Sequence, residues 1–184
     1  VLANKYPTQT AADFGNRMRM HSFTGVDTAA VPPSLPSLLA SFDVLLVFED
    51  STFPNAPAVG NVAAAFAKTG RPVVLGTFYE QDRSDGAPTN SPHGWGDLEK
   101  LDPNTTDGVG TPYAPRAIDP ASIRGHPLTA GVTALSSAKF AGGNNAKDGT
   151  IVVATWNVPN ALGKPDPAIA FRVTGPACVI HVAI

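Results

Sequence analysis

Acidic side chains gather at two places where an apolar run of the chain ends. They are Glu49 and Asp50 after the first run, and Glu80, Asp82 and Asp85 after the second. If the two runs are neighbouring parallel strands, their carboxyl ends share one edge of a sheet and the carboxylates converge on one crevice. A carboxylate pair can act there as general acid and base, or bind calcium together with loop carbonyls. The simpler interpretation, which we favour, is that these residues cap helices and solvate loops.

The segment DRSDG, residues 82–86, carries Asp82 and Asp85 in an arrangement with some likeness to a calcium loop. It lacks the full spacing and the distal glutamate of an EF-hand. Calcium bound by Asp82 and Asp85 therefore stays an open alternative, and the sequence indicates no other cofactor.

Two loop histidines, His93 and His126, could approach the same edge as these carboxylates. An alternative catalytic set is thus His126 with Glu49 and Asp50, which would perform acid–base chemistry or hold a metal. No HxH or HExxH spacing supports that set. His126 directly precedes Pro127, and a turn in which the imidazole hydrogen-bonds to backbone explains it. We therefore predict a structural role for His126 and no catalytic residue.

Aromatic side chains in a long loop are the candidates for ligand binding. Trp95 and Tyr113 lie in residues 81–120, a stretch rich in Gly, Pro, Asp and Asn without sustained periodicity. They could stack on a sugar ring or pack on a partner protein, and Glu80 would join them if a sugar binds. The other interpretation, which the length of the loop favours, is that the aromatics anchor it to the body of the fold.

The elements that would position these residues follow a strand–helix–strand pattern. Residues 43–48 are apolar on both faces, as in a central parallel strand covered by helices, and residues 73–75 repeat the pattern. Between them apolar residues recur at helical spacing, with Pro57 in the first turn and Gly70 at the stop. A parallel pair joined by a helix in this way is right-handed in nearly all proteins.

Weaker signals complete the predicted fold. Thr10 and Asp13 have the spacing of a capping box at the start of a helix, and residues 95–101 suggest a short hairpin. Strands are expected at residues 1–3, 151–156, 168–173 and 177–184, the last two as an antiparallel pair. The prediction is a three-layer α/β fold with a flavodoxin-like sheet, mostly parallel, with an antiparallel strand pair near the C-terminus.

Composition bounds the function classes. The chain has 184 residues, 43% of them hydrophobic, which predicts one domain over residues 1–184. The net charge of −2 leaves no basic surplus for nucleic acid, and no apolar run is long enough to span a membrane. The single cysteine, Cys178, excludes an internal disulfide. With only 15% charged residues, the composition suits a segment of an exported or cell-surface bacterial protein.

Three segments, in this order and spacing, resemble the class I glutamine amidotransferase-like superfamily. They are FDVLLVFEDS (residues 42–51), GRPVVLGTFYE (residues 70–80) and GHPLTAGVTAL (residues 125–135). The nearest branch contains trehalose-utilisation (ThuA-like) proteins, and HPLTAGV is the most specific of the three segments. The resemblance covers residues 42–184 and implies a flavodoxin-like fold.

The resemblance also implies where a nucleophile would stand. Catalytic members carry a Gly-x-Cys-x-Gly elbow after the strand that matches residues 73–75, whereas Phe78 occupies the cysteine position here and Glu80 replaces the closing glycine. We therefore expect a non-catalytic binding or structural module whose partners are other chains or domains of the same assembly. The alternative is a ThuA-like carbohydrate-related enzyme or sugar-binding domain that uses the strand-end carboxylates and His126.

Overall fold

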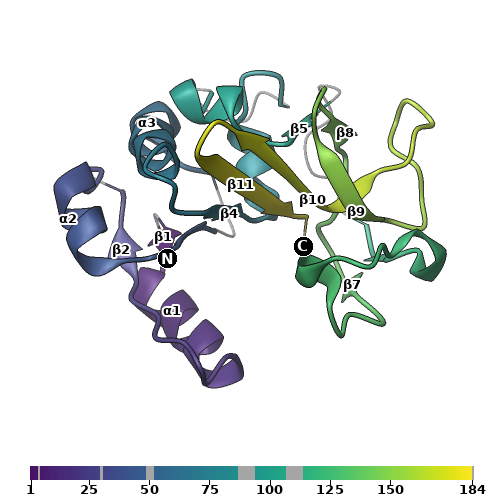
Figure 1. Ribbon diagram of the computed structural model, residues 1–184, viewed down its shortest axis with the longest axis horizontal. Coiled ribbons are helices and arrows are strands. Elements are labelled where there is room, and N and C mark those ends of the chain that lie inside the picture. Colours follow the sequence, from purple (N-terminus) through teal and green to yellow (C-terminus); the bar gives the residue numbers. More distant parts are fainter. Residues whose placement is uncertain (4, 30, 49–51, 87–93, 107–113, 184) are drawn as a thin grey trace.

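The computed structural model (Figure 1) describes residues 1–3, 5–29, 31–48, 52–86, 94–106 and 114–183 and is built around one mixed sheet. The sheet has seven strands in this described part of the chain, in the order β2-β1-β3-β4-β11-β10-β9. Its strands are β1 (Leu2–Ala3), β2 (Val26–Asp27), β3 (Leu45–Val47), β4 (Val73–Leu75), β9 (Ile151–Thr155), β10 (Pro167–Thr174) and β11 (Ala177–Val182).

Parallel pairing dominates this sheet. The pairs β1–β2, β1–β3, β3–β4 and β4–β11 are all parallel. Only β10 runs against its neighbours, because it pairs antiparallel with both β11 and β9. The order β2-β1-β3-β4 is that of a flavodoxin-like sheet, so the predicted fold class is confirmed, including the antiparallel pair near the C-terminus.

Helices cover both faces of the parallel half, as Figure 1 shows. They are α1 (Pro7–Arg17), α2 (Leu35–Ser41) and α3 (Ala56–Ala67). Leu45 and Val47 of β3 pack in the core that α2 and α3 share, while Leu46 packs with residues of α1 on the opposite face. Because both faces are buried, the strands are apolar throughout rather than alternating.

The β3–α3–β4 unit forms as the sequence predicts. Pro57 lies in the first turn of α3, and Gly70 follows the helix with a φ of 91°, a conformation that side chains with a Cβ rarely adopt. The predicted capping box at Thr10 and Asp13 is wrong, because α1 already begins at Pro7. Proline lacks the amide that a first-turn residue leaves unpaired anyway, so it starts the helix without a side-chain cap.

The excursion after β4 contains more structure than predicted. It includes the 3₁₀ helices η1 (Thr77–Asp82) and η2 (Gly96–Lys100), the two-residue strands β5 (Asn104–Thr105) and β6 (Arg116–Ala117), and the start of the 3₁₀ helix η3 (Pro120–Ser122). Strand β5 pairs with β8 (Asn145–Ala146), and β6 pairs with β7 (Ser136–Ser137). A further 3₁₀ helix, η4 (Pro127–Thr129), follows η3.

The hairpin predicted at residues 95–101 is wrong, and η2 takes its place. The carboxylate of Glu99 accepts a hydrogen bond from the amide of Trp95 at 2.8 Å, and the side chain of Asn61 in α3 accepts one from the amide of Asp97 at 2.8 Å. These bonds satisfy the first amides of a helical turn, which a hairpin would pair with another strand instead.

Close packing fixes η2 against α3. A Cβ atom on Gly60 in α3 would lie 2.0 Å from the carbonyl oxygen of Trp95, so only glycine permits this approach.

No helix in the described ranges is long and apolar enough to cross a membrane.

Candidate functional site

In the segment after β4, the side chains of Tyr79 and Glu80 are buried, whereas Phe78 is half-buried. Phe78, at the position where the resemblance implies a cysteine in catalytic members, packs on Phe140 with ring centroids 4.9 Å apart. Tyr79 is 2% exposed and stacks on Trp95, while the side chain of Glu80 is wholly buried. The bend therefore presents no nucleophile at Phe78, and the side chain of Tyr79 is part of the packed interior.

Glu80 lies beside an imidazole that the sequence did not bring to this site. The Oε1 atom of Glu80 is 3.3 Å from Nδ1 of His181, and the side-chain amide of Asn104 is 2.8 Å from the same nitrogen. His181 reaches the bend because β11 pairs parallel with β4, with His181 in register with Leu75. Alternation with Ile180 and Val182 predicts that His181 lies on a sheet face, but it does not reveal which strand lies next to β11.

Burial sets the protonation of this pair. It raises the pKa of Glu80 to about 8, against the opposing charge of Arg83, and it lowers the pKa of His181 to about 3. At pH 7 the carboxyl is therefore protonated and the imidazole is neutral. Two neutral groups with almost no exposed surface can share a hydrogen bond without the cost of a buried charge.

An ionic network lies next to the pair. Asp102, which is 0% exposed, contacts the guanidinium of Arg83 and the ammonium of Lys147, and it accepts a hydrogen bond from the hydroxyl of Tyr79 at 2.6 Å. Burial by itself would lower the pKa of Arg83. The negative charges of Asp102 and the neighbouring carboxylates outweigh burial, so the pKa of Arg83 is raised. The network joins Arg83 after η1, Asp102 shortly before β5 and Lys147 after β8, so it ties the excursion to the separate β5–β8 pair.

The carboxylates proposed for calcium are engaged in the same region. Asp82 accepts a hydrogen bond from the amide of Phe53 at 2.6 Å. Asp85 accepts one from Arg83 Nε at 2.6 Å and one from the amide of Thr106 at 3.1 Å. Among the described residues, no group of three His, Cys, Asp or Glu side chains could hold a metal ion. The structure thus directs Asp82 and Asp85 into hydrogen bonds that hold the loop.

Trp95, a candidate for stacking on a sugar, is 0% exposed. Its Nε1 donates a hydrogen bond to the carbonyl of Tyr79 at 2.8 Å, and its ring centroid lies 4.8 Å from those of both Tyr79 and Phe53. Solvent cannot bring a ligand to this ring, so Trp95 has the anchoring role that the length of the loop favours. Tyr113, the other aromatic candidate, lies outside the described residues.

The histidine of the alternative catalytic set has a structural role in this fold. Nδ1 of His126 accepts a hydrogen bond from the amide of Leu128 at 3.1 Å, which confirms the predicted bond to backbone. The ring also stacks on Phe171 of β10, with centroids 4.8 Å apart. Glu49 and Asp50 lie outside the described residues, as does His93, so their approach to His126 stays a prediction.

The anchoring role of Trp95 predicts a measurable loss of stability. We expect Trp95→Phe to lower the free energy of unfolding by about 1–3 kcal/mol, because it leaves the buried carbonyl of Tyr79 without its donor. Trp156→Phe is the matched control, since Trp156 is 3% exposed but its Nε1 makes no hydrogen bond in the described structure. Urea denaturation followed by circular dichroism measures both. Equal losses in the two variants would show that the Trp95 hydrogen bond contributes nothing.

Comparison with known proteins identifies a fold and no family. No protein-family model and no curated protein matches the chain. Among solved structures, it is similar to Cytoplasmic Protein STM1381 from Salmonella typhimurium LT2, with a TM-score of 0.61 and 15% identity over 84% of this chain. It is also similar to Cytoplasmic Protein STM3548 from Salmonella typhimurium, with a TM-score of 0.53 and 17% identity over 84% of this chain.

The chain spans 64% of the length of each of these two solved proteins. At such low identity the likeness concerns the fold alone, and it agrees with the flavodoxin-like order of the sheet.

Proposed function

We propose that this chain is a non-catalytic binding or structural module of a larger protein assembly, built on a glutamine amidotransferase-like scaffold that lacks the nucleophile. The observation that carries the proposal is the filled bend after β4. By the resemblance, Phe78 takes the position of the catalytic cysteine, and its ring packs on that of Phe140. A scaffold can keep its fold without the chemistry of the proteins it resembles.

The Glu80–His181 pair is the one feature of the bend that favours an enzyme. A carboxyl beside an imidazole is the usual equipment of general acid–base catalysis. Here, however, Glu80 and His181 are each 1% exposed, and catalysis requires the acid or base to reach the proton it transfers. We therefore assign the pair to the internal architecture.

A turnover assay separates the two functions. The chain is incubated with chromogenic ester, amide and glycoside substrates, in parallel with Glu80→Gln and His181→Gln. We expect no turnover above buffer for any of the three proteins, because Phe78 carries no nucleophilic atom and the Glu80–His181 pair is buried. Hydrolysis by the original chain that disappears in a folded Glu80→Gln protein would replace the proposal with the enzyme alternative.

Partners and location are part of the same proposal. The low proportion of charged residues, 15%, supports an exported or cell-surface setting in which other chains or domains cover part of the surface. The word cytoplasmic in the names of the two solved proteins describes those proteins. Fractionation of cells that express the full-length parent protein tests the location, and recovery only in the cytoplasm would contradict it.

A further inference from the structure

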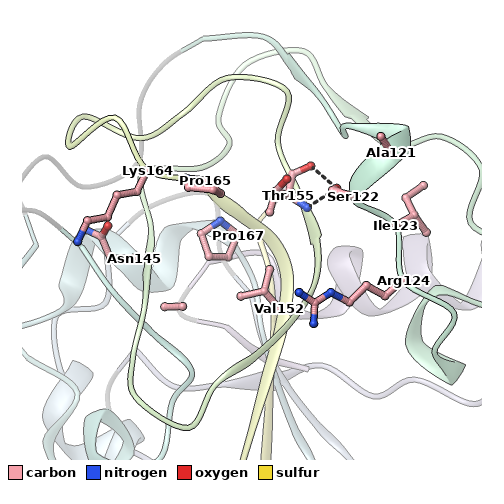
Figure 2. A pocket seen from close by; sticks show the side chains of 11 residues that line it. Ala121, Ser122, Ile123, Arg124, Asn145, Val152, Thr155, Lys164, Pro165 and Pro167 are labelled. Atoms are coloured by element: carbon pink, nitrogen blue, oxygen red, sulfur yellow. Dashed lines mark hydrogen bonds between the residues drawn. The ribbon is translucent and has the colours of Figure 1, made fainter.

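An open groove of about 620 Å³ lies at the β9–β10 end of the sheet, away from the bend after β4 (Figure 2). Its volume falls in the range of small-molecule sites. Strand β9, the start of β10, strand β8 and the segment that contains η3 supply its walls. None of the residues singled out in the sequence lines it.

Two cations face the groove from different walls. Arg124 extends from the segment after η3 toward Val152, and Lys164 lies beside Asn145 on the opposite side (Figure 2). Both residues are exposed, and neither forms a salt bridge within the described part of the chain. The described lining contains no Asp or Glu. The groove therefore has a positive potential that the protein itself does not neutralise.

The nearest acidic residue in sequence is turned away. Asp166, two positions after Lys164, is 0% exposed and accepts hydrogen bonds from Arg116 and from the amide of Gly143, each at 2.6 Å. Its carboxylate is thus paired with Arg116 and is not among the residues that line the groove. Lys164 remains available to a ligand in the groove.

The floor between the two cations is apolar. Pro165, Pro167 and Val152 lie between Lys164 and Arg124 in Figure 2. Proline and valine side chains favour contact with hydrocarbon, whereas the guanidinium of an arginine binds a carboxylate through two parallel hydrogen bonds. The arrangement matches a ligand with an apolar middle and an anionic group at each end.

We propose that this groove binds a small organic dicarboxylate whose hydrocarbon body packs on the proline floor and whose carboxylates pair with Arg124 and Lys164. The inference deepens the proposed function, because it names the ligand class of a module that binds without catalysing a reaction.

The hydroxyl of Ser122 in the wall of the groove is already hydrogen-bonded within the protein. It donates to the carbonyl of Asp119 at 2.7 Å and accepts from the amide of Thr155 at 2.8 Å. No described His, Cys, Asp or Glu lines the groove to activate it.

Isothermal titration calorimetry at low ionic strength tests the inference with aliphatic dicarboxylates from succinate to suberate. Hexanoate and hexane-1,6-diol serve as ligands that lack one or both charges. We expect saturable binding that is strongest for one chain length and roughly two- to fivefold weaker for hexanoate, since an ion pair with an exposed side chain contributes about 0.5–1 kcal/mol. Arg124→Gln and Lys164→Gln should each weaken dicarboxylate binding by a similar factor.

Lys139→Gln is the matched control, because Lys139 is exposed and outside the groove, and it should leave affinity unchanged. All three substitutions concern exposed side chains, so folding is expected to persist, and circular dichroism verifies it. The inference is overturned if no dicarboxylate binds saturably, if the diol binds equally well, or if the Arg124→Gln/Lys164→Gln double variant retains the original affinity.

The outcomes also distinguish this inference from the proposed function. Dicarboxylate binding together with hydrolytic turnover lost in Glu80→Gln would keep the groove and reject the non-catalytic module. Absence of both binding and turnover would reject the groove and leave the non-catalytic module standing.

Discussion

Asp102→Asn is expected to lower the free energy of unfolding by about 3–5 kcal/mol, because it removes one partner of a buried ion pair. The substitution preserves the shape of the side chain but leaves the guanidinium of Arg83, whose side chain is 3% exposed, without its closest counter-charge. Asp85 still accepts from Arg83 Nε at 2.6 Å, so we expect the lower part of that range. Equilibrium denaturation in urea at pH 7 gives the value.

Asp97→Asn is the matched control for Asp102→Asn. Asp97 also forms ion pairs, with Lys100 at 2.6 Å and with Lys68 at 3.8 Å, but all three side chains are substantially exposed. Solvent screens such pairs and side-chain entropy opposes them, so the variant should unfold almost as the original chain does. If Asp102→Asn were equally mild, the network around Arg83 would not be what holds the excursion in place.

Glu80→Gln is expected to change how stability depends on pH. The pKa of Glu80 is raised from 4.5 in the unfolded chain to about 8 in the folded protein. Between these values the folded protein retains a proton that the unfolded chain releases. The contribution of Glu80 to stability is therefore complete below pH 4.5 and is lost as the pH rises toward 8. Glutamine stays neutral throughout and has no such dependence.

The difference in stability between the original chain and Glu80→Gln isolates this group. His181, with a pKa lowered to about 3, and the buried amino group of Val1, with a pKa lowered to about 6, titrate alike in both proteins. From pH 5 to pH 8 the original chain should lose about 3–4 kcal/mol relative to Glu80→Gln, at about 1.4 kcal/mol per pKa unit. Urea denaturation at pH 5, 6, 7 and 8 measures it.

Glu99→Gln provides the matched control over the same range. Burial by itself would raise the pKa of Glu99. The hydrogen bonds from Ser84 and Trp95 outweigh burial, so the pKa of Glu99 is lowered. Glu99 is therefore ionised in both the folded and the unfolded state above pH 5. The difference in the free energy of unfolding between Glu99→Gln and the original chain should stay constant up to pH 8. A constant difference for Glu80→Gln as well would mean that Glu80 is ionised in the folded protein and that the neutral pair does not exist.

These experiments ask whether the bend after β4 is architecture or a reaction centre. A neutral Glu80–His181 pair and a tightly paired Asp102 stabilise the excursion from inside the protein, as the contacts of Trp95 do. Substitution of such structural groups lowers the free energy of unfolding, whereas substitution of catalytic groups lowers turnover. The stability assays and the turnover assay therefore give opposite patterns for the two functions.

Local sequence determined the parallel half of the fold. Residues 43–48 and 73–75 are apolar on both faces, and the helix between them has proline at its start and glycine after its end, so each element follows from neighbours in the chain. The same is true of Phe78, which excludes a cysteine nucleophile by its identity alone. The backbone bond of His126 was also predictable, because it spans only two positions.

The contents of the candidate site were decided by tertiary structure. His181 hydrogen-bonds to Asn104 from 77 positions away, and it meets Glu80 only because β11 lies next to β4. The alternation of a strand indicates which side chains share a face, but it does not indicate which strand is its neighbour. Likewise, the composition of a loop does not show whether Trp95 faces solvent or the core. Burial and pairing between distant segments settle both, since they depend on how the whole chain packs.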